Sequence, residues 1–257
     1  MALAANPPPM DLVYSYTAFF VAYLLGSLSF AVIVSKLMGL NDPRSYGSKN
    51  PGATNVLRSG NKKAAVATLL LDALKGFLPV LIVEHFAFEL GFEDTTIAFV
   101  GVAALLGHLF PVFFRFQGGK GVATAAGVLL AFEPLLGLGV LLTWIVVAAA
   151  FRYSSLASVV AAVVAPFAVL MFFDRPIVAM AVAVMSLLLV WRHWRNIVKL
   201  LTGKESRIGE KADQSNPNSN LNPDSNANAR RKRRRRVRRL HDDVSPDTHP
   251  PHRSKGN

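Results

Sequence analysis

Residues 110–124 read FPVFFRFQGGKGVAT, where an apolar run meets a glycine-rich cationic turn and apolar sequence resumes at once. Three glycines around Lys120 make a backbone that a ligand can approach closely, with several N–H groups pointing inward as in an anion-binding nest. Phosphate is the natural ligand of such a turn. The spacing differs from the nucleotide P-loop, because the four-residue spacer is missing and glycine follows the lysine. Taken alone, the turn is better explained as a solvated membrane turn with an inner-face lysine, so other segments must decide.

The composition is that of a polytopic membrane protein. Of 257 residues 52% are hydrophobic, and the mean hydropathy is +0.35. The chain has no cysteine, which excludes disulfides and thiolate chemistry. The formal charge is +12, but nine basic residues lie within 230–239, which leaves +3 for the rest. The body of the chain is therefore not strongly basic.

Apolar runs near the length of a membrane-spanning helix recur along the chain. A helix needs ~20 residues to cross the hydrocarbon. Seven candidates stand at 12–34, 64–83, 96–114, 122–132, 135–151, 154–173 and 177–191. The fourth has only eleven residues, a length that also fits a re-entrant segment. The sequence therefore predicts an all-α integral membrane protein, a bundle of seven transmembrane helices with a short fourth.

The positions of charged residues in the loops indicate whether the fourth run crosses the membrane or re-enters it. If all seven runs cross and the N-terminus is outside, the inner loops hold Lys120, Arg152 and every basic residue from Arg192 onward. The outer segments then hold Arg175 alone. Deleting the fourth span would place Arg152 and the basic residues of 192–199 outside and break this asymmetry. The positive-inside rule thus favours seven crossings and a cytoplasmic C-terminus.

Two charged residues lie inside the second run. Asp72 and Lys75 are three residues apart and share a helix face, where each offsets the other's cost of burial. We interpret the pair as structural first, and a role in orienting groups at the membrane surface is the alternative.

The composition changes after Gly209. Residues 214–229 are dominated by Asn, Ser, Pro and Asp, which predicts disorder. We therefore divide the chain into a membrane domain at 1–209 and a disordered cytoplasmic tail at 210–257. The arginine run at 230–239 most often means contact with anionic membrane lipids. No nucleic-acid partner is expected, because no aromatic residue or folded module is interleaved with the arginines.

Residues 44–60 form a loop that is longer and more polar than a simple connector. Ser48, Asn50 and Asn55 offer hydroxyl and amide groups, the glycines expose backbone N–H groups, and Arg58 has a fork that can hold a phosphate bidentately. A flexible, soluble loop explains this stretch equally well when it is considered alone.

A third polar segment, RHWRNIVKLLTGKESR, occupies 192–207. His193 and Asn196 are three residues apart and share a helix face. A histidine at a helix end is more often a cap or a headgroup contact than a catalyst, but this one lies on the predicted side of the other two segments. Glu205 has basic neighbours, which favours a structural ion pair over acid catalysis.

With seven crossings, all three segments emerge on one face of the membrane. Together they suit the binding of more than one phosphate beside a bilayer, because two dianions brought close need several cations and N–H donors. No cysteine, carboxylate pair or cluster of metal ligands competes for this role, so we expect neither a metal nor a cofactor.

Four segments resemble, in order, the bacterial acyl-phosphate-dependent glycerol-3-phosphate acyltransferases, the PlsY family. The resemblance covers roughly residues 12–209. It implies a seven-helix enzyme that moves a fatty acyl group from acyl phosphate to the sn-1 hydroxyl of glycerol 3-phosphate, giving lysophosphatidic acid and phosphate. Such enzymes use neither acyl-CoA nor acyl carrier protein. The segments are GSKNPGATNVLRSG at 47–60, DALKGFLPV at 72–80, GHLFPVFFRFQGGKGVATAAGV at 107–128 and the segment at 192–207.

The resemblance also assigns site residues. Its catalytic residues match Ser48, Arg58, His193 and Asn196. Its substrate and phosphate ligands match Asn50, Asn55, Gly118, Gly119, Lys120 and Gly121, and a structural glutamate matches Glu205. Lys49 stands where the family usually has glycine, which leaves the local backbone open.

Two routes exist for the proton released in such a reaction. His193 can act as a general base, or a substrate phosphate can accept the proton directly, as the resemblance favours. A covalent acyl-Ser48 intermediate is disfavoured, because no base is tied to Ser48 in the sequence.

Two other classes of function compete. A small transporter of a phosphorylated solute would also use glycine-rich turns and broken spans, but it would place polar residues near the bilayer midplane. A membrane anchor that presents the arginine-rich tail is the second rival. The acyltransferase interpretation predicts a multi-pass protein of the bacterial inner membrane, with its active site facing the cytoplasm and membrane lipids as partners.

Overall fold

The structure is a computed structural model that describes residues 10–210. Apart from Glu210, the predicted tail and its arginine run lie outside the described residues. Within the described range every regular element is helical, in agreement with the predicted class. In order, they are α1 (Met10–Gly26), α2 (Phe30–Leu37), α3 (Ala53–Leu57), α4 (Lys62–His85), α5 (Ala87–Leu90), α6 (Asp94–Leu109), the 3-10 turn η1 (Val112–Phe114), α7 (Val122–Phe132), α8 (Pro134–Phe151), α9 (Ser154–Phe172), α10 (Pro176–Arg192) and α11 (Trp194–Leu201).

Four of these segments are long and apolar enough to cross a membrane, namely α4, α6 with η1, α8 and α9. Two bent pairs raise the number to as many as six: α1 with α2 bends by 44°, and α10 with α11 by 56°. Helix α7 has eleven residues and is shorter than a span. The runs predicted from the second to the seventh each correspond to one helix or helix-turn unit.

The first run, predicted as one span, is a bent pair of helices rather than one continuous helix. The helix breaks at 27–29, between α1 and α2. Gly26 lies against α6, where an added Cβ would be 2.2 Å from the carbonyl oxygen of Ala104. The carbonyl of Leu28, freed by the break, accepts a hydrogen bond of 2.6 Å from Lys75 Nζ. Close contact with α6 and a side-chain donor from α4 therefore compensate for the interrupted helix.

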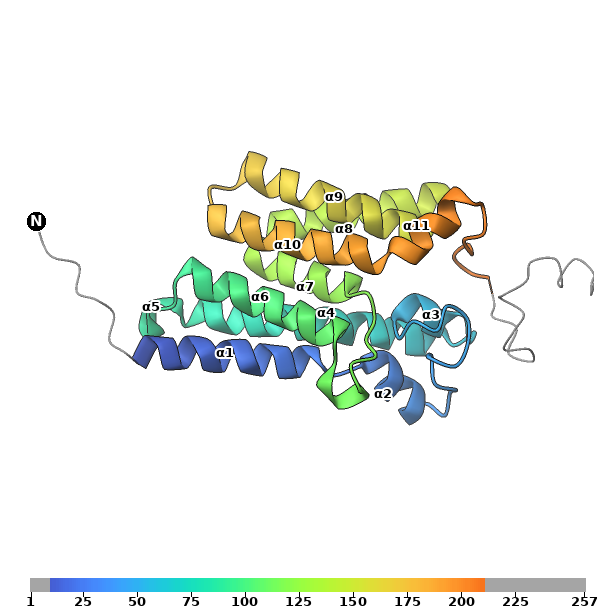
Figure 1. Ribbon diagram of the computed structural model, residues 1–257, viewed down its shortest axis with the longest axis horizontal. Helices are drawn as coiled ribbons and strands as arrows, with labels where there is room; N and C mark the ends of the chain where they lie inside the picture. The colour runs from blue at the N-terminus through green and yellow to red at the C-terminus, as the bar shows by residue number, and fades with distance from the viewer. Residues whose placement is uncertain (1–9, 211–257) are drawn as a thin grey trace, which may run out of the picture. The chain divides into compact units, whose positions relative to one another are not determined.

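Helix α7 lies between α4 and α8 (Figure 1). Helices α7 and α4 lie close together because a glycine of each helix faces the backbone of the other. A Cβ at Gly76 would be 2.2 Å from the carbonyl oxygen of Thr124, and one at Gly127 would be 2.0 Å from that of Ala73. Small residues let membrane helices pack backbone to backbone, so this contact buries α7 despite its short length.

Arg175 joins four helices at the end of α9 where α10 begins. Its guanidinium lies 2.7 Å from Asp94 of α6, 3.2 Å from Glu84 of α4 and 3.4 Å from Glu133 at the start of α8. It also donates to the carbonyl of Phe132, the last residue of α7. The arginine that the sequence placed alone among the outer segments thus holds these helix ends together.

Asp72 and Lys75 form the predicted pair on one face of α4. Their side chains are each 3% exposed, and Nζ lies 2.8 Å from the carboxylate. His108 of α6 lies beside them, with Nδ1 3.7 Å from the same carboxylate oxygen and 2.9 Å from the Thr124 hydroxyl of α7. The pair therefore belongs to a buried polar cluster that links three helices.

We predict that Lys75→Met lowers the stability of the protein by about 2–3 kcal/mol, because Asp72 is left buried without its cation and Leu28 loses a donor. The double variant Asp72→Asn, Lys75→Met should recover part of this loss. Thermal unfolding in detergent measures both. Lys63→Met, which removes an exposed lysine from the same helix, is the control and should change little. A double variant no more stable than Lys75→Met would contradict this account.

Candidate active site

The three polar segments of the sequence line one cavity of about 680 Å³. The loop at 44–60, the glycine-rich turn before α7 and the segment that follows α10 meet at its polar end. The predicted site residues on its wall are Ser48, Asn50, Asn55, Arg58, Lys120, Gly121, His193 and Asn196. Gly118 and Gly119 are absent from this wall. Segments up to about 150 residues apart in sequence are thus brought together.

Asn55 organises the first loop. Its side chain is 2% exposed, its amide donates to the carbonyls of Pro43 and Tyr46, and its oxygen accepts a hydrogen bond from the backbone N–H of Ser48. Both amide donors are therefore used by backbone carbonyls, one within the loop and one just before it. These contacts let Asn55 position Ser48, and Asn55 also lines the cavity. Its substrate contact, expected from the resemblance, stays a prediction.

The backbone at Lys49 explains why the family usually has glycine at this position. Its φ is 57°, in the left-handed region that favours glycine. A non-glycine residue there costs roughly 1 kcal/mol, and the rest of the loop must compensate for it. The loop keeps the turn that a glycine would adopt more easily.

Gly118 and Gly119 are required for close packing. A Cβ at Gly118 would lie 2.2 Å from the carbonyl oxygen of His108, and one at Gly119 would lie 2.3 Å from His108 Nε2. The N–H of Gly119 donates to the carbonyl of His108, so it is not directed at the cavity. Gly118 and Gly119 thus serve the fit of the turn against α6. Their predicted contact with phosphate stays a prediction.

Arg192, at the end of α10, fixes the orientation of this turn. Its guanidinium donates to the carbonyl oxygens of Gly118 and Gly119 at 2.9–3.1 Å. These carbonyls therefore face Arg192 rather than the ligand space. An anion in the cavity would be repelled by exposed carbonyl oxygens, so this contact makes the turn compatible with phosphate.

The start of α7 forms one wall of the polar end. Gly121 occupies the N-cap position of α7 with φ of 82°. No side chain accepts a hydrogen bond from the first N–H groups of the helix. Gly121, Val122 and Ala123 line the cavity. The first N–H groups of a helix lack intrahelical partners and carry partial positive charge, so this terminus suits an anion.

Lys120 points across the cavity to the last polar segment. Its Nζ donates to Asn196 Oδ1 at 2.6 Å, and Asn196 donates in turn to Glu205 at 2.7 Å. Burial lowers the pKa of Lys120 to about 8, against the influence of Glu205, and the nearby cations Lys199, Arg58 and Arg192 lower it further. Burial also lowers the pKa of Arg58, which stays a cation.

Glu205 was expected to form an ion pair with its basic neighbours. Within residues 10–210 its carboxylate is instead held by hydrogen bonds from Asn196 and from the Ser155 hydroxyl, each at 2.7 Å. These contacts tie the segment after α11 to the start of α9. A structural role stands, with amide and hydroxyl partners in place of a cation.

His193 lies at the bend between α10 and α11 and is 2% exposed. Its Nδ1 lies 2.8 Å from the carbonyl oxygen of Leu189. A carbonyl can only accept, so Nδ1 carries the proton and Nε2 of the neutral ring is left as an acceptor. This contact fixes the tautomer that His193 presents to the cavity.

Beyond the polar end, the cavity continues between apolar helix faces. Its walls there come from α4, α7, α8, α9 and α10, and include Leu69, Leu129, Val140, Trp144, Ala161 and Met185. One continuous space thus joins a cationic pocket to an apolar channel, which suits a molecule with a phosphate at one end and a hydrocarbon chain at the other.

Comparisons with known proteins agree with this geometry. A family model described as glycerol-3-phosphate acyltransferase matches residues 16–203. The chain belongs to the glycerol-3-phosphate acyltransferase family. A relative of that name from Paraburkholderia phytofirmans is 64% identical over 191 residues, which cover 74% of this chain and 89% of the relative. One from Burkholderia vietnamiensis is 67% identical over 194 residues, with coverage of 74% and 89%.

Solved structures support the same family. The chain resembles the crystal structure of PlsY, described as an integral membrane glycerol 3-phosphate acyltransferase, in its glycerol 3-phosphate form. The identity is 42%, the TM-score is 0.71, and the match covers 76% of this chain and 96% of that one. The chain is therefore a multi-pass membrane acyltransferase of bacterial type, and the comparisons do not favour the transporter alternative.

Sequence reasoning missed several residues of this acyltransferase site. Arg192 entered only as one of the basic residues that set the topology, and its bonded carbonyls lie 73 and 74 residues away. His108 stands in a quoted segment but had no assigned task, and Ser155 had none either. No local pattern marks a residue whose partners are backbone atoms of a distant segment.

We predict that Gly119→Ala lowers the rate of acyl transfer to glycerol 3-phosphate by roughly tenfold to a hundredfold, because the turn must move away from His108 and displace Lys120. The matched control is Gly139→Ala in α8, where an added Cβ meets nothing within 4 Å. Initial rates of both variants in lipid test this. Near-normal activity of Gly119→Ala would show that the turn tolerates the displacement.

Proposed function

We propose that the chain transfers a fatty acyl group from acyl phosphate to the sn-1 hydroxyl of glycerol 3-phosphate, giving lysophosphatidic acid and phosphate. The observation that carries the proposal is the continuous cavity, in which Lys120, Arg58 and the uncapped start of α7 adjoin an apolar channel. The relatives and the PlsY structures support glycerol 3-phosphate as the acceptor. The acyl phosphate donor is what the resemblance to the PlsY family implies, and the charge of the cavity is compatible with it.

An acyl phosphate fits the site because it joins a phosphate directly to the end of an acyl chain. With its chain in the apolar channel, its phosphate would lie at the cationic end, beside the phosphate of glycerol 3-phosphate. Two phosphates close together need several cations, and Lys120 and Arg58 with the N–H groups of α7 supply them. A thioester donor brings no phosphate next to its carbonyl and would leave part of this charge unmatched.

The reaction itself needs little from the protein beyond alignment. The acceptor oxygen attacks the acyl carbon, the bond from that carbon to the phosphate oxygen breaks, and phosphate leaves with the electron pair. Lys120 and Arg58 stabilise the charge on the departing phosphate. Ser48 and Asn50 position the substrates, while His193 and Asn196 orient the glycerol phosphate.

The proton of the attacking hydroxyl passes to a substrate phosphate in this scheme. His193 has a free acceptor at Nε2, but taking the proton would create a second buried positive charge close to Lys120. A phosphate oxygen can take the proton without creating a positive charge, because protonation only reduces the negative charge of the phosphate. His193 then serves as a hydrogen-bond acceptor for the glycerol phosphate hydroxyls.

We further propose that the seven apolar runs cross the bacterial inner membrane with the cavity opening to the cytoplasm. The loop charges support this, because they give an inner face rich in Lys and Arg. Helix α7 would count as the short fourth crossing, completed by the packing that encloses it. Glycerol 3-phosphate, a soluble cytoplasmic metabolite, would then reach the site directly.

The donor test uses the full chain in lipid with glycerol 3-phosphate and one of three donors: acyl phosphate, acyl-CoA or acyl carrier protein. We expect lysophosphatidic acid and phosphate with acyl phosphate alone. Lys120→Ala should lower this rate at least a hundredfold, since a desolvated phosphate loses its main cation. Lys63→Ala removes a lysine outside the cavity and should leave the rate unchanged. Turnover with a thioester alone would refute the proposed donor.

The pH dependence tests Lys120 directly. Because the pKa of Lys120 is about 8 in the free protein, its side chain is positively charged below that pH and loses the charge as the pH rises through 8. We expect kcat/KM for glycerol 3-phosphate to fall between about pH 7 and pH 9, where the substrate stays dianionic. Lys120→Arg keeps its charge throughout and should remove the fall, whatever its absolute rate. The same fall in Lys120→Arg would assign it to another group.

A further inference from the structure

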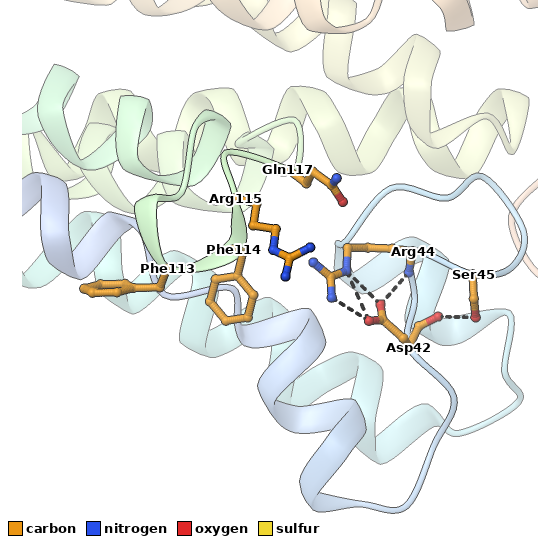
Figure 2. Close-up of a pocket in the computed structure, with 7 residues that line it drawn as sticks. All are labelled: Asp42, Arg44, Ser45, Phe113, Phe114, Arg115 and Gln117. Carbon is orange, nitrogen blue, oxygen red and sulfur yellow. Dashed lines mark hydrogen bonds and ion pairs between the residues drawn. The ribbon is translucent and has the colours of Figure 1, made fainter.

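A second pocket of about 530 Å³ lies outside the substrate cavity and shares no lining residue with it. The turn after α6 forms one side, and the chain that follows α2 forms the other (Figure 2). Its lining residues are Asp42, Arg44, Ser45, Phe113, Phe114, Arg115 and Gln117. The proposed reaction uses none of them.

The charges in this pocket are unbalanced. The Asp42 carboxylate accepts hydrogen bonds from Nε and Nη2 of Arg44 at 2.7–3.1 Å. Arg115 makes no hydrogen bond or ion pair with any residue between 10 and 210. Its guanidinium nevertheless faces that of Arg44 across the pocket (Figure 2). Two arginines and one carboxylate leave the pocket with a net positive charge, which a bound anion can balance.

The backbone of the turn is strained where Arg115 projects. Arg115 and Phe116 have φ values of 53° and 57°, so two consecutive bulky residues occupy the left-handed region. Such residues cost of order 1 kcal/mol each and tend to mark ligand contacts. The N–H groups of Phe114 and Phe116 both donate to the carbonyl of Pro111, which holds the turn in this form. Arg115 lines the pocket from this turn.

Apolar side chains around the pocket point to a membrane location. The turn ends the candidate span Asp94–Phe114, so it lies where a helix leaves the hydrocarbon. Phe113 and Phe116 are 57% and 60% exposed on either side of Arg115. Exposed aromatic rings are common at the level of lipid headgroups, and a neighbouring arginine there meets lipid phosphates.

We propose that this pocket binds the headgroup phosphate of an anionic membrane phospholipid. Arg115 and the remaining N–H groups of Arg44 hold the phosphate, Gln117 supplies a further amide, and Phe113 and Phe116 contact the upper acyl chains. A soluble phosphate ester fits less well, because the two exposed rings would stay in water when it bound. The site is independent of the proposed reaction, so either can fail without the other.

The bound lipid would contact the two loops that also form the substrate cavity. Gln117 directly precedes Gly118, and Ser45 lies three residues before Ser48. A phosphate bridging Arg44 and Arg115 would join these two loops outside the substrate cavity. The lipid is thus a structural ligand at the rim of the enzyme.

The test measures binding of a short-chain fluorescent phosphatidylglycerol to the full chain in neutral detergent, by anisotropy. Phosphatidylglycerol is used because it is neither substrate nor product of the proposed reaction. We expect Arg115→Gln to weaken its saturable binding roughly fivefold, the size of one exposed ion pair. Arg115→Lys, which keeps the positive charge, should weaken lipid binding less than Arg115→Gln does. Arg195→Gln removes an exposed arginine of α11 outside the pocket and should bind as the unaltered chain does.

Each other outcome would overturn the proposal. Equal weakening by Arg195→Gln would mean that only total charge matters, and no effect of Arg115→Gln would mean that lipid binds elsewhere, as on the arginine-rich tail. Competition by inorganic phosphate at the concentration of the lipid would assign the pocket to a soluble anion. Because the Arg115 side chain has no partner among the described residues, its variant should fold, and an unchanged midpoint of thermal unfolding in detergent would confirm this.

Discussion

The rest of the site depends on where α7 begins. This helix is too short for a full span, and glycines on both α4 and α7 let the two backbones pack together. The helix therefore begins inside the protein, at the wall of the cavity. No side chain caps the N–H groups of its first turn. In that position a helix terminus is less screened by water than at a surface, so its partial charge acts more strongly on a phosphate.

The turn that leads into α7 is held from two sides. His108 packs beneath its glycines and accepts the N–H of Gly119, while Arg192 binds two of its carbonyls. The remaining direction, toward the cavity, is taken by Lys120, which reaches Asn196 and through it Glu205. Fixing a flexible glycine turn in this way reduces the cost of ordering it when a phosphate binds.

Charge and hydrophobicity meet at both pockets of this enzyme. The substrate cavity joins a cationic end to an apolar channel, and the outer pocket sets arginines beside exposed phenylalanines. Both combinations suit molecules with an anionic head and a hydrocarbon tail. In the cavity burial removes water from Lys120 and lowers its pKa, whereas Arg115 is exposed and its interactions with an anion are weaker.

The sequence determined the helical membrane class, the positions of the apolar runs, the pairing of Asp72 with Lys75 and the three polar segments, and its resemblance to a family supplied the chemistry. Periodicity and composition act locally, so they can be read along one chain. Tertiary structure alone decided the break at 27–29, the scaffold role of Asn55 and the packing role of Gly118 and Gly119. It also decided the contribution of Arg192. Those features depend on backbone atoms of distant segments, whose partners no local pattern specifies.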